Sequence, residues 1–378
     1  MTPQKLTGFN RFVCFVIAAI IVILIIGFVA SGRQNDENPD SGDVGNSTDD
    51  TDQGNIYDST INADNTLTPQ DKEGETGTDT PPVVYVNPLT GLQVSESRYN
   101  STPSAIVIDP SSPIYGISDA DIALEIPIEH GSTRMLVYDS SEETLWKIGA
   151  LMPTRKFISA ITGFFGGLII ANGEDDKIAY DTFSPASPII DISKYSDCFY
   201  VENTKYVYTS ENMIESAKNK FSDIPKDYKY KNAPYDFYTD DNFLGTATAT
   251  TIIIPFSEKN ETELYYHQAT ESYIYYKSSS IKMDMLTGSN ISYKNVFILF
   301  ADTTTYEKSE GEQLVVNVNS GGKGYYASEG KYLEFTWNTD INGELEFYSL
   351  NGERLKVNPG NSYFAYYKSS SIQSVYLI

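Results

Sequence analysis

Five charged side chains between positions 109 and 155 are the ones best suited to acid–base chemistry. They are Asp109, Glu125, Glu129, Arg134 and Arg155. On a strand over residues 122–129, Glu125 and Glu129 would face the same side, about 13 Å apart, and Arg134 on the returning strand would lie opposite one of them. This group predicts a polar cleft that holds a sugar or a peptide, with hydrolysis by general acid–base catalysis. The alternative, which the sequence favours, is an ion-pair network that fixes strand register, because such networks are far commoner in folded domains than unrecognised active sites.

Histidine and cysteine chemistry has little support. The chain has two histidines: His130 precedes a glycine, as a turn residue would, and His267 lies in a tyrosine-rich strand. Neither has a nucleophile motif beside it. Of the two cysteines, Cys14 falls in an apolar segment, which leaves Cys198 alone and excludes an intramolecular disulfide or a cysteine-based zinc site in the soluble region. We therefore expect no metal and no cofactor.

The chain contains 29 tyrosines, concentrated after about residue 245. Exposed aromatic faces bind glycans or partner proteins because they offer apolar area at low entropic cost. The candidates are Tyr325, Tyr326 and Trp337, with further tyrosines at 265, 266, 275 and 276. Because adjacent residues on a strand point to opposite faces, one tyrosine of each pair is expected to pack in the core instead.

The elements that must position these residues fall into two segments. Residues 83–235 predict a mixed α/β domain: strands at 104–109, 122–129, 134–139 and 168–171, a short helical turn opened at Ser118, and helices at 156–162 and 211–221. Residues 245–378 predict a mainly antiparallel β domain, with strands at 250–256, 263–267, 273–277, 296–300, 314–318, 332–337 and 344–348. The predicted fold class is α+β.

The N-terminal part predicts membrane attachment. Residues 12–30 carry no charge, and a helix of that length spans roughly 28 Å, close to the hydrocarbon thickness of a bilayer. Lys5 and Arg11 precede this segment, so residues 1–11 are expected in the cytoplasm and the remainder outside. A cleaved signal peptide is the alternative. Residues 31–82 are acidic and poor in apolar side chains, which predicts a disordered linker.

The overall charge excludes one class of partner. The formal net charge is −24 at pH 7, whereas a surface that binds phosphates must supply lysine and arginine. We expect no nucleic acid.

The order of short motifs resembles the YerB-like family of bacterial surface proteins, a two-part domain of unknown function. In the first segment they are NPLTGL (87–92), AIVID (105–109), GISDADI (116–122), Glu125, EHGSTR (129–134), Ile148-Gly149 and Arg155. In the second they are Asp284 with Thr287-Gly288, KNV (294–296), GGKGYY (321–326), Thr336-Trp337 and VNPGN (357–361). The resemblance covers about residues 87–370. It implies a two-part fold at the bacterial surface, and no established activity.

The chain departs from the family pattern at three places. Residues 170–173 read IANG where the family tends to have His-Ala-Gly-Gly, Lys282 stands where it tends to have a histidine, and an arginine expected just before Arg155 is absent. Any chemistry that relatives perform with those groups is expected to be lost here.

Together these features predict a membrane-anchored extracytoplasmic binding or scaffolding protein of the bacterial cell envelope. Its expected partners are a cell-wall polymer or another envelope protein, with the N-terminal helix in the membrane. The alternative is an envelope hydrolase that acts on glycan or peptide through the acidic residues of the first domain.

Overall fold

The computed structural model describes residues 83–139, 145–173, 188–221, 231–239, 243, 245–308 and 311–378. The predicted cytoplasmic tip (1–11), membrane anchor (12–30) and acidic linker (31–82) lie outside these residues. Within them, no helix is both long enough and apolar enough to cross a membrane.

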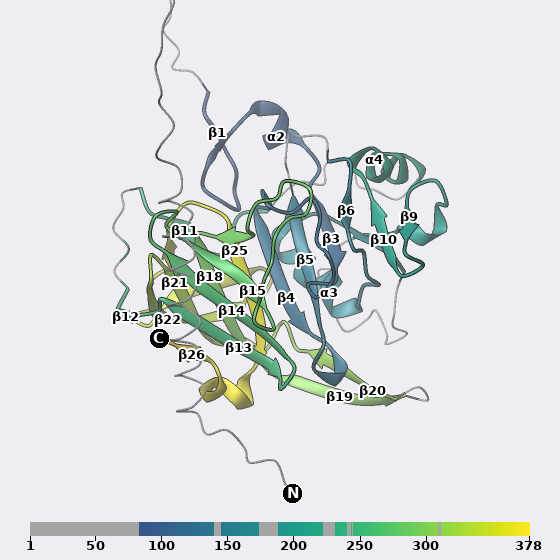
Figure 1. Ribbon diagram of the computed structural model, residues 1–378. Helices are drawn as coiled ribbons and strands as arrows, with labels where there is room; N and C mark the ends of the chain where they lie inside the picture. The colour runs from purple at the N-terminus through teal and green to yellow at the C-terminus, as the bar shows by residue number, and fades with distance from the viewer. Residues whose placement is uncertain are drawn as a thin grey trace, which may run out of the picture. The chain divides into compact units, whose positions relative to one another are not determined.

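One large sheet organises the described residues, as Figure 1 shows. Its strand order is β12-β22-β21-β18-β25-β4-β5-β3-β7-β8, with β23 paired to β22. The bounds are β3 Ser104–Ile108, β4 Ile122–Pro127, β5 Thr133–Asp139, β7 Leu168–Ala171, β8 Ile189–Asp191, β12 Ala247–Thr248, β18 Asn295–Ala301, β21 Gly322–Ser328, β22 Lys331–Thr339, β23 Leu345–Ser349 and β25 Ser362–Lys368.

The two predicted segments share this sheet. Strand β25, near the end of the chain, pairs in parallel with β4 of the first segment and with β18 of the second. The strands β18, β25 and β4 are therefore three neighbouring parallel strands that end at the same edge. Every residue of β18 and β4, and all but the last residue of β25, is buried, as expected for parallel strands covered on both faces.

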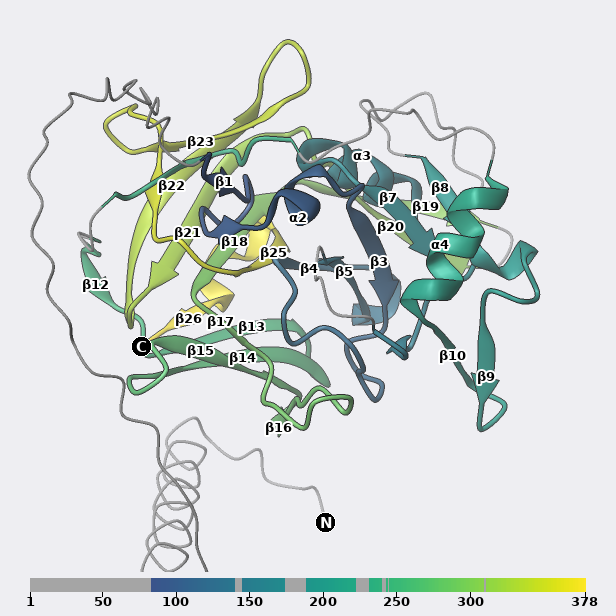
Figure 2. The same cartoon turned by 90° about the horizontal axis from the view of Figure 1, so that it is seen from above.

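A second sheet covers one face of the large one, and helix α3 (Lys156–Phe165) lies on the other (Figure 2). This sheet has the order β16-β15-β14-β13-β26, with β17 paired to β15. Its bounds are β13 Thr251–Ser257, β14 Asn260–His267, β15 Ser272–Lys277, β16 Ser280–Ile281, β17 Ser292–Tyr293 and β26 Tyr376–Leu377. Two separate apolar cores result, one on each face.

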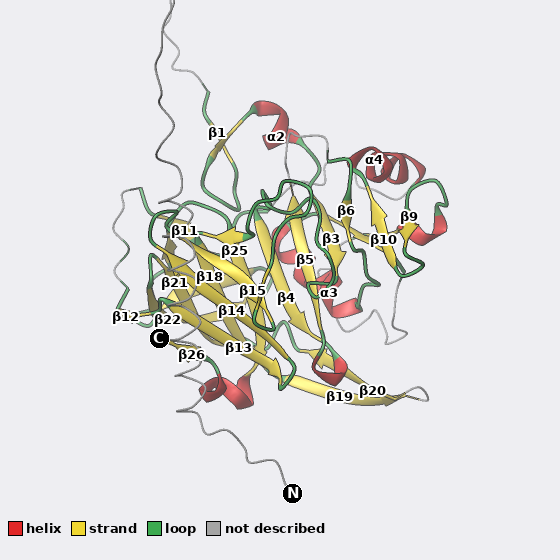
Figure 3. Ribbon diagram, viewed as in Figure 1, coloured by secondary structure: helices red, strands yellow, loops and turns green. Residues whose placement is uncertain are grey.

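Smaller elements border these layers. They are β1 Tyr85–Val86 with β2 Gln93–Val94, α2 Glu96–Asn100, the sheet β6-β10-β9 (Ile148–Gly149, Tyr206–Thr209, Tyr200–Glu202), α4 Glu211–Lys220, β11 Asp236–Phe237 with β24 Lys356–Val357, and the hairpin β19 Thr303–Lys308 with β20 Gly311–Val316. Short 3₁₀ helices are η1 Glu129–Gly131, η3 Ile192–Lys194 and η4 Ser369–Ser374. Strands dominate throughout (Figure 3), so the expectation of an α+β fold is met only in part.

Helix ends follow local sequence signals in two cases and depart from them in a third. Ser210 caps α4 by accepting a hydrogen bond from the Met213 amide at 3.3 Å, as expected. Helix α3 runs past the predicted stop at Gly163 and ends at Gly166, whose φ of 73° needs glycine. At Ser118, where a helical turn was predicted, the chain forms a single hydrogen-bonded turn, with the Ala120 amide donating to the Ile117 carbonyl at 3.1 Å, and no helix follows.

Beside the large sheet, Lys147 is buried between two tyrosine rings. Its ammonium lies 3.9 Å from the centre of the Tyr115 ring and 4.2 Å from that of Tyr208, and both carboxylate oxygens of Glu202 accept from it at 2.8 Å. Burial alone would lower the pKa of Lys147, but the bond to Glu202 and the nearby tyrosines outweigh it and raise that pKa. The lysine is therefore charged at neutral pH.

Replacing Lys147 with methionine is expected to lower the free energy of unfolding by about 1–2 kcal/mol, because the desolvated cation–π contacts are lost while the apolar stem is kept. Urea unfolding of the full-length protein at pH 7 measures this. The control is Lys194→Met, since the Lys194 side chain is 69 % exposed and should change stability by less than about 0.5 kcal/mol. Equal effects of the two substitutions would contradict the role given to Lys147.

Candidate functional site

Glu125 is a fully buried carboxylate where the two segments meet. Lys277 pairs with its Oε1, and Thr133 donates to the same oxygen at 2.6 Å. Its Oε2 accepts from the hydroxyls of Thr262 at 2.7 Å, Tyr275 at 3.2 Å and Tyr363 at 2.7 Å. Glu125 thus binds groups from β14, β15 and β25, and no part of it is exposed.

The charges of this pair follow from their surroundings. Burial acts to raise the pKa of Glu125, but the ammonium of Lys277 and the hydroxyl donors outweigh it, so the pKa lies below its usual value. Burial lowers the pKa of Lys277, while Glu125 opposes that shift. The ionised glutamate is a satisfied structural group and not an accessible acid.

Glu129 faces a different part of the molecule from Glu125, so the predicted shared face was wrong. Strand β4 ends at Pro127, and the chain turns through η1, where His130 has a φ of 58°. The alternation of side chains between the two faces of the strand ends at this turn. Glu129 instead pairs with Arg155, the N-cap residue of α3.

The two remaining members of the predicted group bind groups other than Glu125, although Asp109 lies close enough to act to raise the pKa of Lys277. Arg134 is opposite Ile126 in the sheet register and donates through Nε to the Pro153 carbonyl at 3.2 Å, so it points away from the face of Glu125. Asp109 accepts from the Ser111 amide at 2.8 Å and the Ser112 hydroxyl at 2.6 Å. The five residues therefore do not converge in one cleft.

A second buried carboxylate, Asp284, joins the same two segments. Its Oδ1 accepts from the amides of Gly116 at 2.9 Å and Leu286 at 2.8 Å. Its Oδ2 accepts from the amides of Ile117 at 2.7 Å and Ser118 at 2.8 Å. The GISDADI and Asp284 motifs, far apart in the sequence, are thus two halves of one contact.

Two of the three aromatic candidates belong to the core, so they cannot form a binding face. Tyr326 is 0 % exposed and stacks on Phe297 with ring centres 4.8 Å apart. Trp337 is 2 % exposed and donates to the Lys323 carbonyl at 3.1 Å. Tyr325 is half-buried against Phe300. The expectation that one tyrosine of a pair packs inward is confirmed for Tyr325 and Tyr326.

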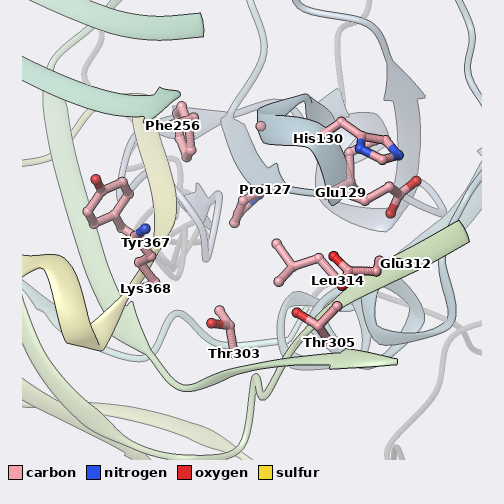
Figure 4. Close-up of a pocket in the computed structure, with 12 residues that line it drawn as sticks. Pro127, Glu129, His130, Phe256, Thr303, Thr305, Glu312, Leu314, Tyr367 and Lys368 are labelled. Carbon is pink, nitrogen blue, oxygen red and sulfur yellow. The ribbon is translucent and has the colours of Figure 1, made fainter. Parts of the chain in front are cut away.

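A concave site does exist at the edge where the three parallel strands end. Figure 4 shows a pocket with a volume of about 240 Å³. It is lined by Pro127, Ile128, Glu129, His130, Gly131, Phe256, Thr303, Thr305, Glu312, Leu314, Tyr367 and Lys368. The carboxyl ends of parallel strands are a recurrent place for ligands in open sheets, because the loops that follow them diverge and leave a crevice.

The strand ends and the hairpin supply opposite walls of this pocket. Residues 367–368 end β25, Pro127 ends β4 and residues 128–131 follow it, and Thr303 follows β18. In the hairpin register Thr305 pairs with Leu314 and Thr303 with Val316, so one face of β19–β20 presents alternate residues to the pocket.

A backbone requirement shapes the rim. His130 and Gly131 both have positive φ, 58° and 70°, and a Cβ on Gly131 would collide with the side chain of Ser257. The interpretation of His130 as a turn residue is thereby confirmed. The sequence pointed to Glu129 and to a strand at 314–318 that overlaps β20, but not to Lys368 or to β19. The only signal for β19 was the short run of threonines at 303–305.

Among the described residues, no group of three or more His, Cys, Asp or Glu side chains is placed to hold a metal ion. The residues that line the pocket carry two carboxylates, one imidazole, one ammonium and three hydroxyls beside apolar walls. That set can bind a small polar molecule by charge and hydrogen bonds.

These features define a two-part, β-rich protein whose segments are joined by one sheet, with a small pocket at the joint. The N-terminal domain of the protein of unknown function DUF3048 matches residues 89–244, and its C-terminal domain matches residues 252–364. The chain belongs to this YerB-like DUF3048 family. The crystal structure of YerB from Bacillus subtilis is similar in fold, with a TM-score of 0.67 and 20 % identity over 78 % of this chain and 99 % of that one. No curated protein matches the chain.

Proposed function

We propose that the protein is a membrane-anchored, extracytoplasmic binding or scaffolding protein of the bacterial cell envelope, and that the pocket at the ends of β18, β25 and β4 is its ligand site. The observation that carries the binding role is the pocket itself, whose lining comes from both segments. Its proposed partner is a cell-wall polymer or another envelope protein.

The contacts of the acidic residues favour binding over hydrolysis. Glu125 is 0 % exposed and both its oxygens are saturated with donors, so it cannot reach a polymer. Glu129 is held by Arg155. A glycosidase-like mechanism needs two carboxyl groups facing one bond. The two carboxylates of the pocket are Glu312 and Glu129, and Arg155 already binds Glu129, so the hydrolase is the alternative that the analysis of released fragments tests.

A matched pair of substitutions on one strand tests the pocket. Thr305 lines it, whereas Thr304 precedes it on β19 with its side chain on the opposite face of the hairpin. Thr305→Trp should fill the pocket and reduce binding of the full-length protein, in detergent, to purified peptidoglycan at least tenfold. Thr304→Trp should leave binding within twofold.

The readout is co-sedimentation with peptidoglycan, together with analysis of released fragments. Binding without released fragments supports the binding role. Turnover would support the hydrolase instead. Equal binding by the two tryptophan variants would show that the pocket is not the ligand site.

Membrane attachment needs a separate test. The proposal rests on the uncharged residues 12–30 and the cations that precede them. A reporter fused to the C-terminus, active only outside the cytoplasm, should be active and remain with the membrane fraction. Activity confined to the cytosol would overturn the envelope role.

A further inference from the structure

The pocket has charges of opposite sign at its two ends. Figure 4 shows Lys368 across the pocket from Glu129 and Glu312, and all three residues line it. Glu129 is partly neutralised by Arg155, whereas Glu312 is exposed. Neither Glu312 nor Lys368 has an ion-pair partner among the described residues.

The acidic end of the pocket also contains a carboxylate oxygen without a hydrogen-bond donor among the described residues. The Oε1 of Glu129 accepts from Arg155, but its Oε2 is buried and receives no hydrogen bond from the rest of the described structure. A carboxylate oxygen shielded from water costs free energy until a donor reaches it. This oxygen keeps negative charge at the acidic end of the pocket although Arg155 binds the other oxygen of Glu129.

Between the two ends the pocket lining includes both polar and apolar side chains. Hydroxyls of Thr303 and Thr305 lie on one wall, with Pro127 and Leu314 among the apolar lining. The volume of about 240 Å³ corresponds to about eight water molecules at about 30 Å³ each. A group the size of two small amino-acid residues fits in that volume.

We infer that this pocket binds a dipeptide-sized zwitterion, with its ammonium toward Glu312 and Glu129 and its carboxylate toward Lys368. The inference rests on the proposed function and narrows it, because the part of a wall polymer that enters the pocket would be a terminal residue that keeps both a free amine and a free carboxylate, as a diamino acid joined to the chain through one of its two amines does. A neutral sugar has no charged group that could pair with the charged side chains at either end of the pocket.

Calorimetric titration of the full-length protein with L-alanyl-L-alanine and its D,D isomer tests the inference. The preferred isomer should bind, and N-acetylation or C-terminal amidation should each weaken binding at least tenfold. Glu312→Gln should remove most of the penalty of acetylation, and Lys368→Met most of the penalty of amidation. The control variants are Glu334→Gln and Lys356→Met, which change exposed residues away from the pocket and should preserve both penalties.

Each other outcome has a distinct meaning. Equal binding of capped and free dipeptides would overturn the inference. Failure of both dipeptides to bind, while Thr305→Trp still abolishes peptidoglycan binding, would overturn the ligand class and leave the proposed function standing. If neither dipeptide binds and Thr305→Trp leaves peptidoglycan binding unchanged, the pocket is not the ligand site, and both the proposed function of the pocket and this inference are overturned.

Discussion

Replacing Glu125 with glutamine is expected to lower the free energy of unfolding by about 3–5 kcal/mol, because it leaves the ammonium of Lys277 buried without a counter-charge. The side chain of Lys277 is 2 % exposed, so water cannot take over the role of the glutamate. The hydroxyls of Thr262 and Tyr363 can rotate to suit an amide, so the loss comes mainly from the unpaired charge. Urea unfolding of the full-length protein at pH 7 measures it.

Two comparisons isolate the charge effect. Glu334→Gln, an exposed change on β22, should alter stability by less than about 0.5 kcal/mol. The double variant Glu125→Leu with Lys277→Met should regain much of the loss, because removing both partners leaves no uncompensated charge. A loss below about 1 kcal/mol for Glu125→Gln would contradict the account of this pair.

The effect should also depend on pH with a defined sign. Because the pKa of Glu125 is lowered in the folded protein, its ionised form stabilises the fold above the unfolded pKa of about 4.3. That contribution is lost as the pH falls through the lower, folded pKa. The difference between wild type and Glu125→Gln should therefore be full at pH 7 and shrink in acid.

Replacing Asp284 with alanine is expected to cost at least about 3 kcal/mol, because four backbone amides lose a charged acceptor in a place that water does not reach. Asp284 is 0 % exposed. Asparagine should rescue little, although it has nearly the same shape. Each carboxylate oxygen accepts two amides, so the NH₂ of asparagine must face two donors whichever way it is placed.

Asp340→Ala provides the matched control for Asp284. Asp340 also accepts from backbone amides, those of Asn342 at 2.9 Å and Glu344 at 2.7 Å, but its turn is exposed. Water can replace the lost acceptor there, so the cost should be about 1 kcal/mol. If denaturant unfolding gave Asp284→Asn a stability within about 0.5 kcal/mol of wild type, the proposed clamp on residues 116–118 would be wrong.

The substitutions at Glu125 and Asp284 both test contacts between the first and the second segment. These contacts between distant residues show which parts of the structure the sequence could not predict. The strands at 104–109, 134–139 and 296–300 were predicted correctly, because each is a short run rich in apolar side chains. Local pattern carries that information. It does not carry strand order, so the parallel pairing of β25 with β4 was not foreseen.

Strand β25 was missed although its sequence, SYFAYYK, is typical of a buried strand. The omission mattered because β25 links the two segments and ends at the pocket. Hairpin strand β19 was also missed, since its residues at 303–305 are all threonine and bear no alternation of polar and apolar side chains.

The candidate site, too, depends on contacts between distant residues that a local sequence pattern cannot predict. Glu125 was recognised as important, but its partners Lys277 and Tyr363 lie 152 and 238 residues further along the chain. No spacing rule connects such positions. Glu129 was recognised too, but the turn at His130, which redirects it from the strand face to Arg155, depends on left-handed backbone at two successive residues.

Hydrogen–deuterium exchange of the full-length protein, with and without soluble peptidoglycan fragments, tests most directly whether the pocket is the ligand site. The account predicts slower exchange in the peptides that cover residues 127–131, 303–308, 311–314 and 367–368, which meet at the pocket. It predicts no change in α4 or in β9 and β10. Bound fragments that protect those distant elements and leave the pocket segments unchanged would contradict it.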